Sequence, residues 1–187
     1  MKSVHMAFYC CLFVCTIAEQ TNAQSYKKIH KEAIVIDTHN DILSKLLEKG
    51  YMFDEDLTGK THSDLGRMFR GGIDIQVFSV WCDGLKQNPY TFANREIDTL
   101  YAVVGRHPDK MILVKTPTDL TESVNEKKLG CMLGVEGGHM IENDLSKLDT
   151  LYRRGVRYVT LTWNNSTLWA TSAMEETHDS LLNQSKG

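Results

Sequence analysis

The sequence predicts an α/β fold that is organised around a parallel sheet. Short apolar segments alternate with longer segments of helical periodicity. The apolar segments lack the alternation of apolar and polar residues that is typical of a sheet with one solvent-exposed face. Strands of this kind are covered on both faces, so we expect helices to pack outside the sheet. With 42% hydrophobic and 24% charged residues, the chain has a globular composition and can bury one core.

Four apolar segments are expected to be the main strands of this sheet. They cover residues 33–38, 71–81, 131–136 and 156–164, and MILVKT at 111–116 is expected to add a short strand. Because the segment at 33–38 is apolar without alternation, we expect it to be fully buried.

The segments between the strands are expected to be helical. Apolar residues recur at helical spacing within 40–49, 91–109 and 143–155, while 119–130 is a polar helix that stops at its final glycine. Residues 51–70 are mixed and polar, which indicates a loop with a short helical turn. The predicted order is therefore β-α-β-α-β-α-β within one domain, or part of one.

Residues 1–23 have the layout of a secretory signal peptide. A positive start is followed by the apolar run at 6–18 and by the small residues Thr21 and Ala23. The run is short for a spanning helix, although a membrane anchor or an unstructured leader are the alternatives. We therefore expect a secreted or periplasmic protein with a mature part at residues 24–187. Membrane association is expected only through the N-terminal segment, where this segment is retained.

Charge and cysteine content narrow the functional class. The formal net charge is −3 with no basic cluster, so no nucleic-acid partner is expected. Of the five cysteines, only Cys82 and Cys131 lie outside the expected signal peptide. Two cysteines do not make a disulfide scaffold, and Cys131 is expected to be a small buried hydrophobe.

Polar side chains follow three of the expected strands at the end where ligands bind in parallel α/β sheets. The first strand ends at His39 and Asp41, and the third ends at Glu136. His139 follows the third strand, and the fourth strand ends near Trp163 and Asn164, which are further polar or aromatic candidates. We expect these groups to meet at one edge of the sheet.

The pair His39 and Asp41 has the character of a metal site. In an extended chain, side chains two residues apart point to the same side, roughly 6.5–7 Å apart along the strand. An imidazole nitrogen and carboxylate oxygens suit zinc and similar ions, and Glu136 could add a ligand or bridge two ions. Alternatives stay open at this point: the pair could be solvated loop groups, and Glu136 could cap a helix or pair with an arginine.

Four segments resemble the membrane (renal) dipeptidases, which are zinc peptidases of the amidohydrolase-like (β/α)8 barrel group. The resemblance covers roughly residues 30–175. Its segments are IDTHNDIL at 36–43, GGIDIQVFSVW at 71–81, GVEGGHMIENDLSKLDTLYRRGVRYVTLT at 134–162 and NNSTLWATSA at 164–173. The resemblance implies a partial TIM-type barrel, roughly its first four βα units.

The resemblance also implies roles for individual residues. His39 and Asp41 would bind one Zn²⁺ of a two-zinc centre, Glu136 would bridge both ions, and an activated hydroxide would attack the amide bond of a dipeptide. Trp163 stands where family members usually carry a histidine that helps to hold the substrate carbonyl, so we expect Trp163, with Asn164 and His139, to contact substrate. Family members are often homodimers.

Two further departures from the family affect the expectations. The family often has a disulfide at Cys82, but the partner position here is Asn165, so no bridge is expected. Barrels of this type run to about 250 residues or more, so the 187 residues are expected to be the N-terminal half. The remaining ligands and catalytic groups of the family come from the other half. This chain alone is therefore expected to hold at most one ion, without turnover.

The resulting hypothesis is zinc-dependent hydrolysis of dipeptides. One alternative is a non-catalytic binding or scaffold protein on the same fold. A second is a related barrel hydrolase that acts on lactones, esters or other amides, because fold-level similarity does not fix the substrate.

Overall fold

The computed structural model describes residues 26–175, so the expected signal peptide at 1–23 lies outside the described residues. The chain divides into two compact units between Val35 and Ile36. Of the first unit, the structure describes a helix over residues 26–32. All labelled strands and helices belong to the second unit. Among the described residues, no helix is long and apolar enough to span a membrane.

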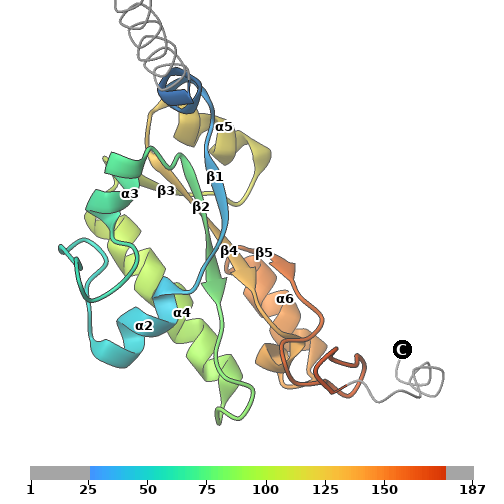
Figure 1. The fold of residues 1–187 in the computed structure, drawn as a ribbon. Helices are drawn as coiled ribbons and strands as arrows, with labels where there is room; N and C mark the ends of the chain where they lie inside the picture. Colours follow the sequence, from blue (N-terminus) through green and yellow to red (C-terminus); the bar gives the residue numbers. More distant parts are fainter. Residues whose placement is uncertain (1–25, 176–187) are drawn as a thin grey trace, which may run out of the picture. The chain divides into compact units, whose positions relative to one another are not determined.

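Five strands form one parallel sheet in the second unit (Figure 1). They are β1 (Ile36–Asn40), β2 (Ile75–Val80), β3 (Met111–Leu113), β4 (Leu129–Val135) and β5 (Val156–Val159). The order is β1-β2-β4-β3, and β5 also pairs with β4. Along one edge β4 pairs with β2; along its other edge its first residues pair with β3 and its last with β5. The expected strands and the parallel arrangement are therefore confirmed.

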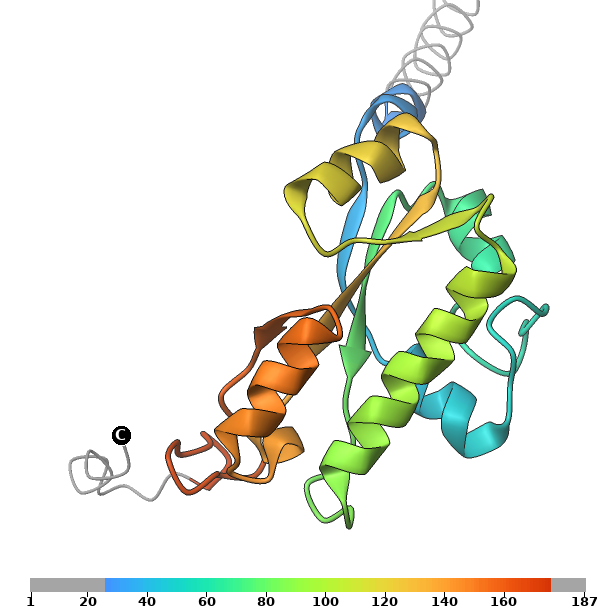
Figure 2. The ribbon, with the colours of Figure 1, turned by 180° about the vertical axis from the view of Figure 1, so that it is seen from behind.

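Helices connect successive strands, as the sequence predicts. They are α2 (Ile42–Lys49), α3 (Leu65–Gly71), α4 (Pro89–Arg106), α5 (Pro117–Asn125), the short 3₁₀ helix η1 (Gly138–Ile141) and α6 (Leu145–Arg153). Figures 1 and 2 show α2, α3 and α4 together on one side of β1 and β2, and α6 beside β5. This repeated strand–helix order with parallel strands is consistent with part of a TIM-type barrel.

The core lies between the sheet and the helices, and β2 is its most buried strand. Every residue of β2 is buried, which fits an apolar strand covered on both faces. Phe78 of β2 meets Phe53 edge to face, with ring centroids 5.6 Å apart. Since Phe53 belongs to the loop between α2 and α3, this contact fixes that loop against the sheet.

The structure corrects the expectation of full burial for the first strand. The strand starts at Ile36, later than expected, and Ile36 is 47% exposed. Among the described residues β1 pairs only with β2, so one of its edges has no neighbouring strand. The apolar sequence indicated a strand correctly but did not show that it lies at an edge.

The structure also corrects the end of the helix predicted at 119–130. The helix α5 ends at Asn125, and Gly130 lies inside β4. A Cβ atom at Gly130 would come within 2.8 Å of the Ser123 Oγ atom. This glycine therefore serves the close approach of α5 to β4 and is not a helix stop.

Candidate metal centre

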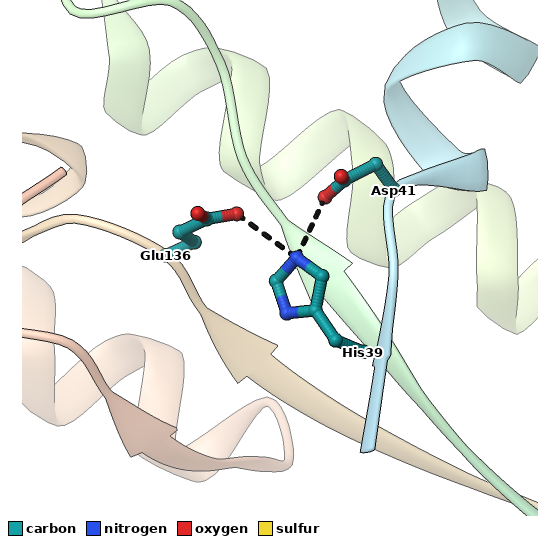
Figure 3. A group of neighbouring side chains, drawn as sticks. All are labelled: His39, Asp41 and Glu136. Carbon is teal, nitrogen blue, oxygen red and sulfur yellow. Dashed lines mark hydrogen bonds and ion pairs between the residues drawn. The ribbon is translucent and has the colours of Figure 1, made fainter. Parts of the chain in front are cut away.

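His39, Asp41 and Glu136 converge at the carboxyl ends of two strands (Figure 3). His39 is the penultimate residue of β1, and Glu136 directly follows β4. Asp41 lies beyond the strand, at the N-cap of α2, where φ is −83° and ψ is 17°. The convergence agrees with the sequence expectation, but Asp41 reaches the cluster from a helix start and not from an extended strand.

The three side chains are in direct contact through His39. Its Nε2 atom lies 3.1 Å from Asp41 Oδ1 and 3.1 Å from Glu136 Oε2. The side chains of His39 and Asp41 are 43% and 52% exposed, and that of Glu136 is 25% exposed. The cluster is therefore open to solvent on one side, which gives an ion and water a path to it.

The spacing and chemistry of these atoms fit a first-row divalent ion. Bonds of about 2.0–2.2 Å to nitrogen and oxygen place the ligands of a tetrahedral ion roughly 3.3 Å apart. The one nitrogen and two carboxylate oxygens all lie within 4.8 Å of one another. One imidazole with two carboxylates is a donor set that suits zinc and neighbouring metals better than calcium.

Two residues beside the cluster were not identified from the sequence. Ser79 Oγ lies 3.4 Å from Glu136 Oε2, which it can orient. The ring of Tyr158 occupies the space over Gly134, its register partner in β4. Burial raises the pKa of Tyr158, and the charges of Glu136 and Asp41 raise it further. Gly134 has no side chain and so leaves space beside β4 for the Tyr158 ring. A glycine within an apolar strand was therefore the sequence signal that a neighbouring group packs closely there.

A cleft of about 990 Å³ lies next to Asp41. Among the residues that line it are Lys45, Lys60, His62 and Trp81. It is large enough for a small organic ligand and combines an indole with charged groups of both signs. The candidate metal centre therefore borders a space that can accept a substrate.

The three residues predicted to contact substrate have different surroundings. Trp163 meets Trp81 edge to face at 5.2 Å between ring centroids, so it supports a residue of the cleft wall. Asn164 is exposed. His139 Nε2 donates to the Cys82 carbonyl oxygen at 3.0 Å, and burial lowers the pKa of His139. A substrate role for these three residues stays a prediction.

A buried carboxyl group was also missed. Glu96 of α4 is fully buried, and its Oε2 atom accepts the Trp81 backbone N–H at 2.9 Å. Burial is the main cause that raises its pKa to about 9. Its place between Ala93 and Leu100 on the apolar stripe of the helix was a signal that this acid faces the core.

The cysteines agree with the expectation of no bridge. Cys82 and Cys131 are both free and buried. Burial raises the pKa of the Cys82 thiol to about 12, so this group is a neutral thiol at neutral pH. Asn165, which stands at the position expected for the disulfide partner, packs against Gly84.

The parallel sheet and the His–Asp–Glu cluster at its carboxyl edge define a class, the α/β barrel proteins with a candidate metal centre at the ends of their strands. A model of the membrane dipeptidase family (peptidase family M19) matches residues 23–187. The chain therefore belongs to the membrane dipeptidase family.

Individual relatives agree with this assignment. Human Dipeptidase 3 is 33% identical over 157 residues, which cover 81% of this chain and 31% of the relative. An uncharacterized dipeptidase of Schizosaccharomyces pombe is 31% identical over 170 residues, or 80% of this chain and 40% of the relative. The chain thus spans between about a third and two fifths of the length of these relatives.

A solved structure confirms the fold. It is a metallo peptidase from Rhodobacter sphaeroides liganded with a phosphinate mimic of the dipeptide L-Ala-D-Ala. The two structures superpose with a TM-score of 0.65 and 18% identity, over 74% of this chain and 48% of the other. At this identity the likeness concerns the fold alone.

Proposed function

We propose that the protein hydrolyses dipeptides with the help of zinc bound at His39, Asp41 and Glu136. The observation that carries the proposal is the position of His39 Nε2, 3.1 Å from an oxygen of each carboxylate. Membership of the membrane dipeptidase family supports the reaction class. The name of human Dipeptidase 3 and the dipeptide mimic bound to the Rhodobacter enzyme support a dipeptide as substrate.

In this proposal the three side chains hold the ion, and neighbouring residues shape its surroundings. A bound divalent ion would polarise the substrate carbonyl and lower the pKa of water. Ser79 would keep the Glu136 carboxylate oriented, because its Oγ lies 3.4 Å from Oε2. Trp81, supported by Trp163, would form an apolar wall beside the reacting groups.

The finer features of the proposal are two Zn²⁺ ions per complete subunit, with Glu136 shared between them, and assembly as a homodimer. Glu136 has a second carboxylate oxygen that could serve another ion. We also propose secretion directed by residues 1–23, on the basis of their sequence pattern. The N-terminal segment would be the only part in contact with a membrane.

The test uses the protein expressed from its complete coding sequence. Zinc is titrated into the metal-free protein, and a panel of dipeptides, lactones and other amides is then assayed with and without zinc. We expect about two ions per subunit and cleavage of dipeptides that depends on zinc. Zinc binding without turnover would favour a binding or scaffold protein, and turnover confined to lactones or other amides would favour the related hydrolase class. Absence of zinc binding would overturn the proposal.

A further inference from the structure

The strand that carries His39 contains a β-bulge. Asp37 pairs with Gln76, and Asn40 pairs with Phe78, so three steps along β1 match two steps along β2. The register shifts between Asp37 and Asn40, the interval that contains His39. Bulges occur next to active sites because they redirect a side chain.

The bulge decides on which face of the sheet His39 lies. Residues paired across two strands share a face, and Phe78 faces the helix side, where it meets Phe53. In a regular strand, residue 39 would lie on the same face as residue 37, toward the helices. The extra residue places both Asp37 and Asn40 on that face and leaves His39 to point toward Glu136.

The side chain of Gln76 spans this bulge from the neighbouring strand. Gln76 is fully buried in β2. Its Nε2 atom donates to the carbonyl oxygen of Asp37 at 3.2 Å and to that of Val77 at 3.0 Å. Its Oε1 atom accepts from Asn40 Nδ2 at 3.4 Å. One buried amide therefore contacts β1 on both sides of the bulged interval.

Asn40 links Gln76 to the segment that holds the second ligand, Asp41. Its Oδ1 atom accepts the backbone N–H of Ile42 at 3.0 Å, in the first turn of α2. Asp41, which lies between these two residues, has no side-chain capping bond and so keeps its carboxylate for the cluster. Its backbone carbonyl in turn accepts from Ser44 Oγ at 2.9 Å. The chain on either side of Asp41 is thereby fixed.

We infer that Gln76 is a positioning residue of the metal centre, which acts through the bulge and Asn40 to aim His39 and Asp41 at one ion. The inference rests on the proposed metal centre and adds to it a residue that contacts neither ion nor substrate. Outer partners that orient metal ligands commonly contribute about 10–100-fold to metal affinity.

The experiment compares Gln76→Met with the wild type, both expressed from the complete coding sequence and stripped of metal. Methionine matches glutamine in length but cannot form the three amide contacts. Zinc affinity is measured by competition with a chromophoric chelator, and Co²⁺ is added to record its visible absorption, which reports ligand geometry. We expect an affinity about 10–100-fold lower and an altered Co²⁺ spectrum.

Two further variants separate positioning from general destabilisation. Ser123→Ala is the matched control, because Ser123 is a fully buried polar residue whose Oγ donates to the Leu120 carbonyl oxygen within α5. We expect it to keep wild-type affinity and spectrum. Asn40→Ala removes the side chain that donates to Gln76 Oε1. Because Asn40 is only half-buried, this variant takes the place of Gln76→Met if Gln76→Met does not fold.

The outcomes separate this inference from the proposed function. Wild-type affinity and spectrum in the folded Gln76→Met variant, or in Asn40→Ala where that takes its place, would overturn the role of Gln76 and leave the metal centre intact. Failure of the wild type and of Ser123→Ala to bind Zn²⁺ would overturn the metal centre, and the role of Gln76 with it.

Discussion

His39 and Glu136 are in contact although their strands are not neighbours. β2 lies between β1 and β4, yet His39 Nε2 is 3.1 Å from Glu136 Oε2. Neighbouring strands are about 4.8 Å apart, so side chains from alternate strands of a flat sheet would be separated by roughly twice that distance. They meet here because both project inward from a curved sheet, as alternate strands do in a barrel.

Removal of a metal ligand should abolish zinc binding and catalysis at the cluster of His39, Asp41 and Glu136. We expect His39→Ala or Asp41→Ala to lose one zinc ion per subunit and nearly all dipeptidase activity, a larger effect than the 10–100-fold typical of outer partners. Zinc content and kcat/KM of the purified variants are the measurements. Glu122→Ala is the control, since Glu122 is exposed on α5 and does not belong to the cluster. Full zinc content and rate in either ligand variant would disprove the assignment.

Trp163 should influence which substrates are accepted. An indole offers one N–H donor and cannot reproduce a protonated imidazole, and here the ring supports Trp81 at the cleft wall. We expect Trp163→His to change the ratio of kcat/KM values between dipeptides while zinc content stays intact. An unchanged substrate profile would count against a contact between this position and the substrate.

The buried acid Glu96 should make stability depend on pH. Its pKa in the folded protein, about 9, lies above its ordinary value of 4.5. Between these values the folded state keeps a proton that the unfolded state has lost, so the free energy of unfolding falls as pH rises, by at most about 1.4 kcal/mol per pH unit. Above the folded pKa this contribution is fully lost.

Glu96→Gln removes this titration and keeps an acceptor for the Trp81 N–H. We expect urea unfolding between pH 5 and pH 9 to show a flatter pH dependence for Glu96→Gln than for the wild type. Glu122→Gln, on the exposed side of α5, is the control and should follow the wild type. Parallel curves for Glu96→Gln and the wild type would contradict the raised pKa.

The loop between α2 and α3 should depend on one aromatic anchor. Phe53 is 1% exposed and packs on Phe78. We expect Phe53→Ala to lower the free energy of unfolding by about 3–5 kcal/mol, since it leaves a cavity in the core. Leu85 is 94% exposed, so Leu85→Ala serves as a control with little effect. Equal stability of the two variants would show that the loop does not rely on this contact.

Sequence patterns were sufficient for the alternation of parallel strands and helices along the chain and for the meeting of His39 with Glu136. Apolar segments gave the strands, and the common direction of parallel strands placed their carboxyl ends at one edge. The bulge in β1 was not predictable, because it depends on the register with β2 and on the buried amide of Gln76, which is distant in sequence.

Other structural details could not be predicted from the sequence for similar reasons. Gly130 was interpreted as a helix stop, but its role comes from the packing of Ser123 against β4. His139 follows Gly137, whose φ of 99° turns the chain into η1 and directs the imidazole to Cys82. A positive φ and a contact between distant segments are set by tertiary structure, so the sequence alone did not reveal them.

Anomalous diffraction at the zinc absorption edge, from crystals of the protein grown with zinc, tests the central claim most directly. We predict a zinc peak within bonding distance, about 2.0–2.2 Å, of His39 Nε2 and of a carboxylate oxygen of both Asp41 and Glu136. A zinc peak elsewhere, with these three side chains turned away from one another, would contradict the account.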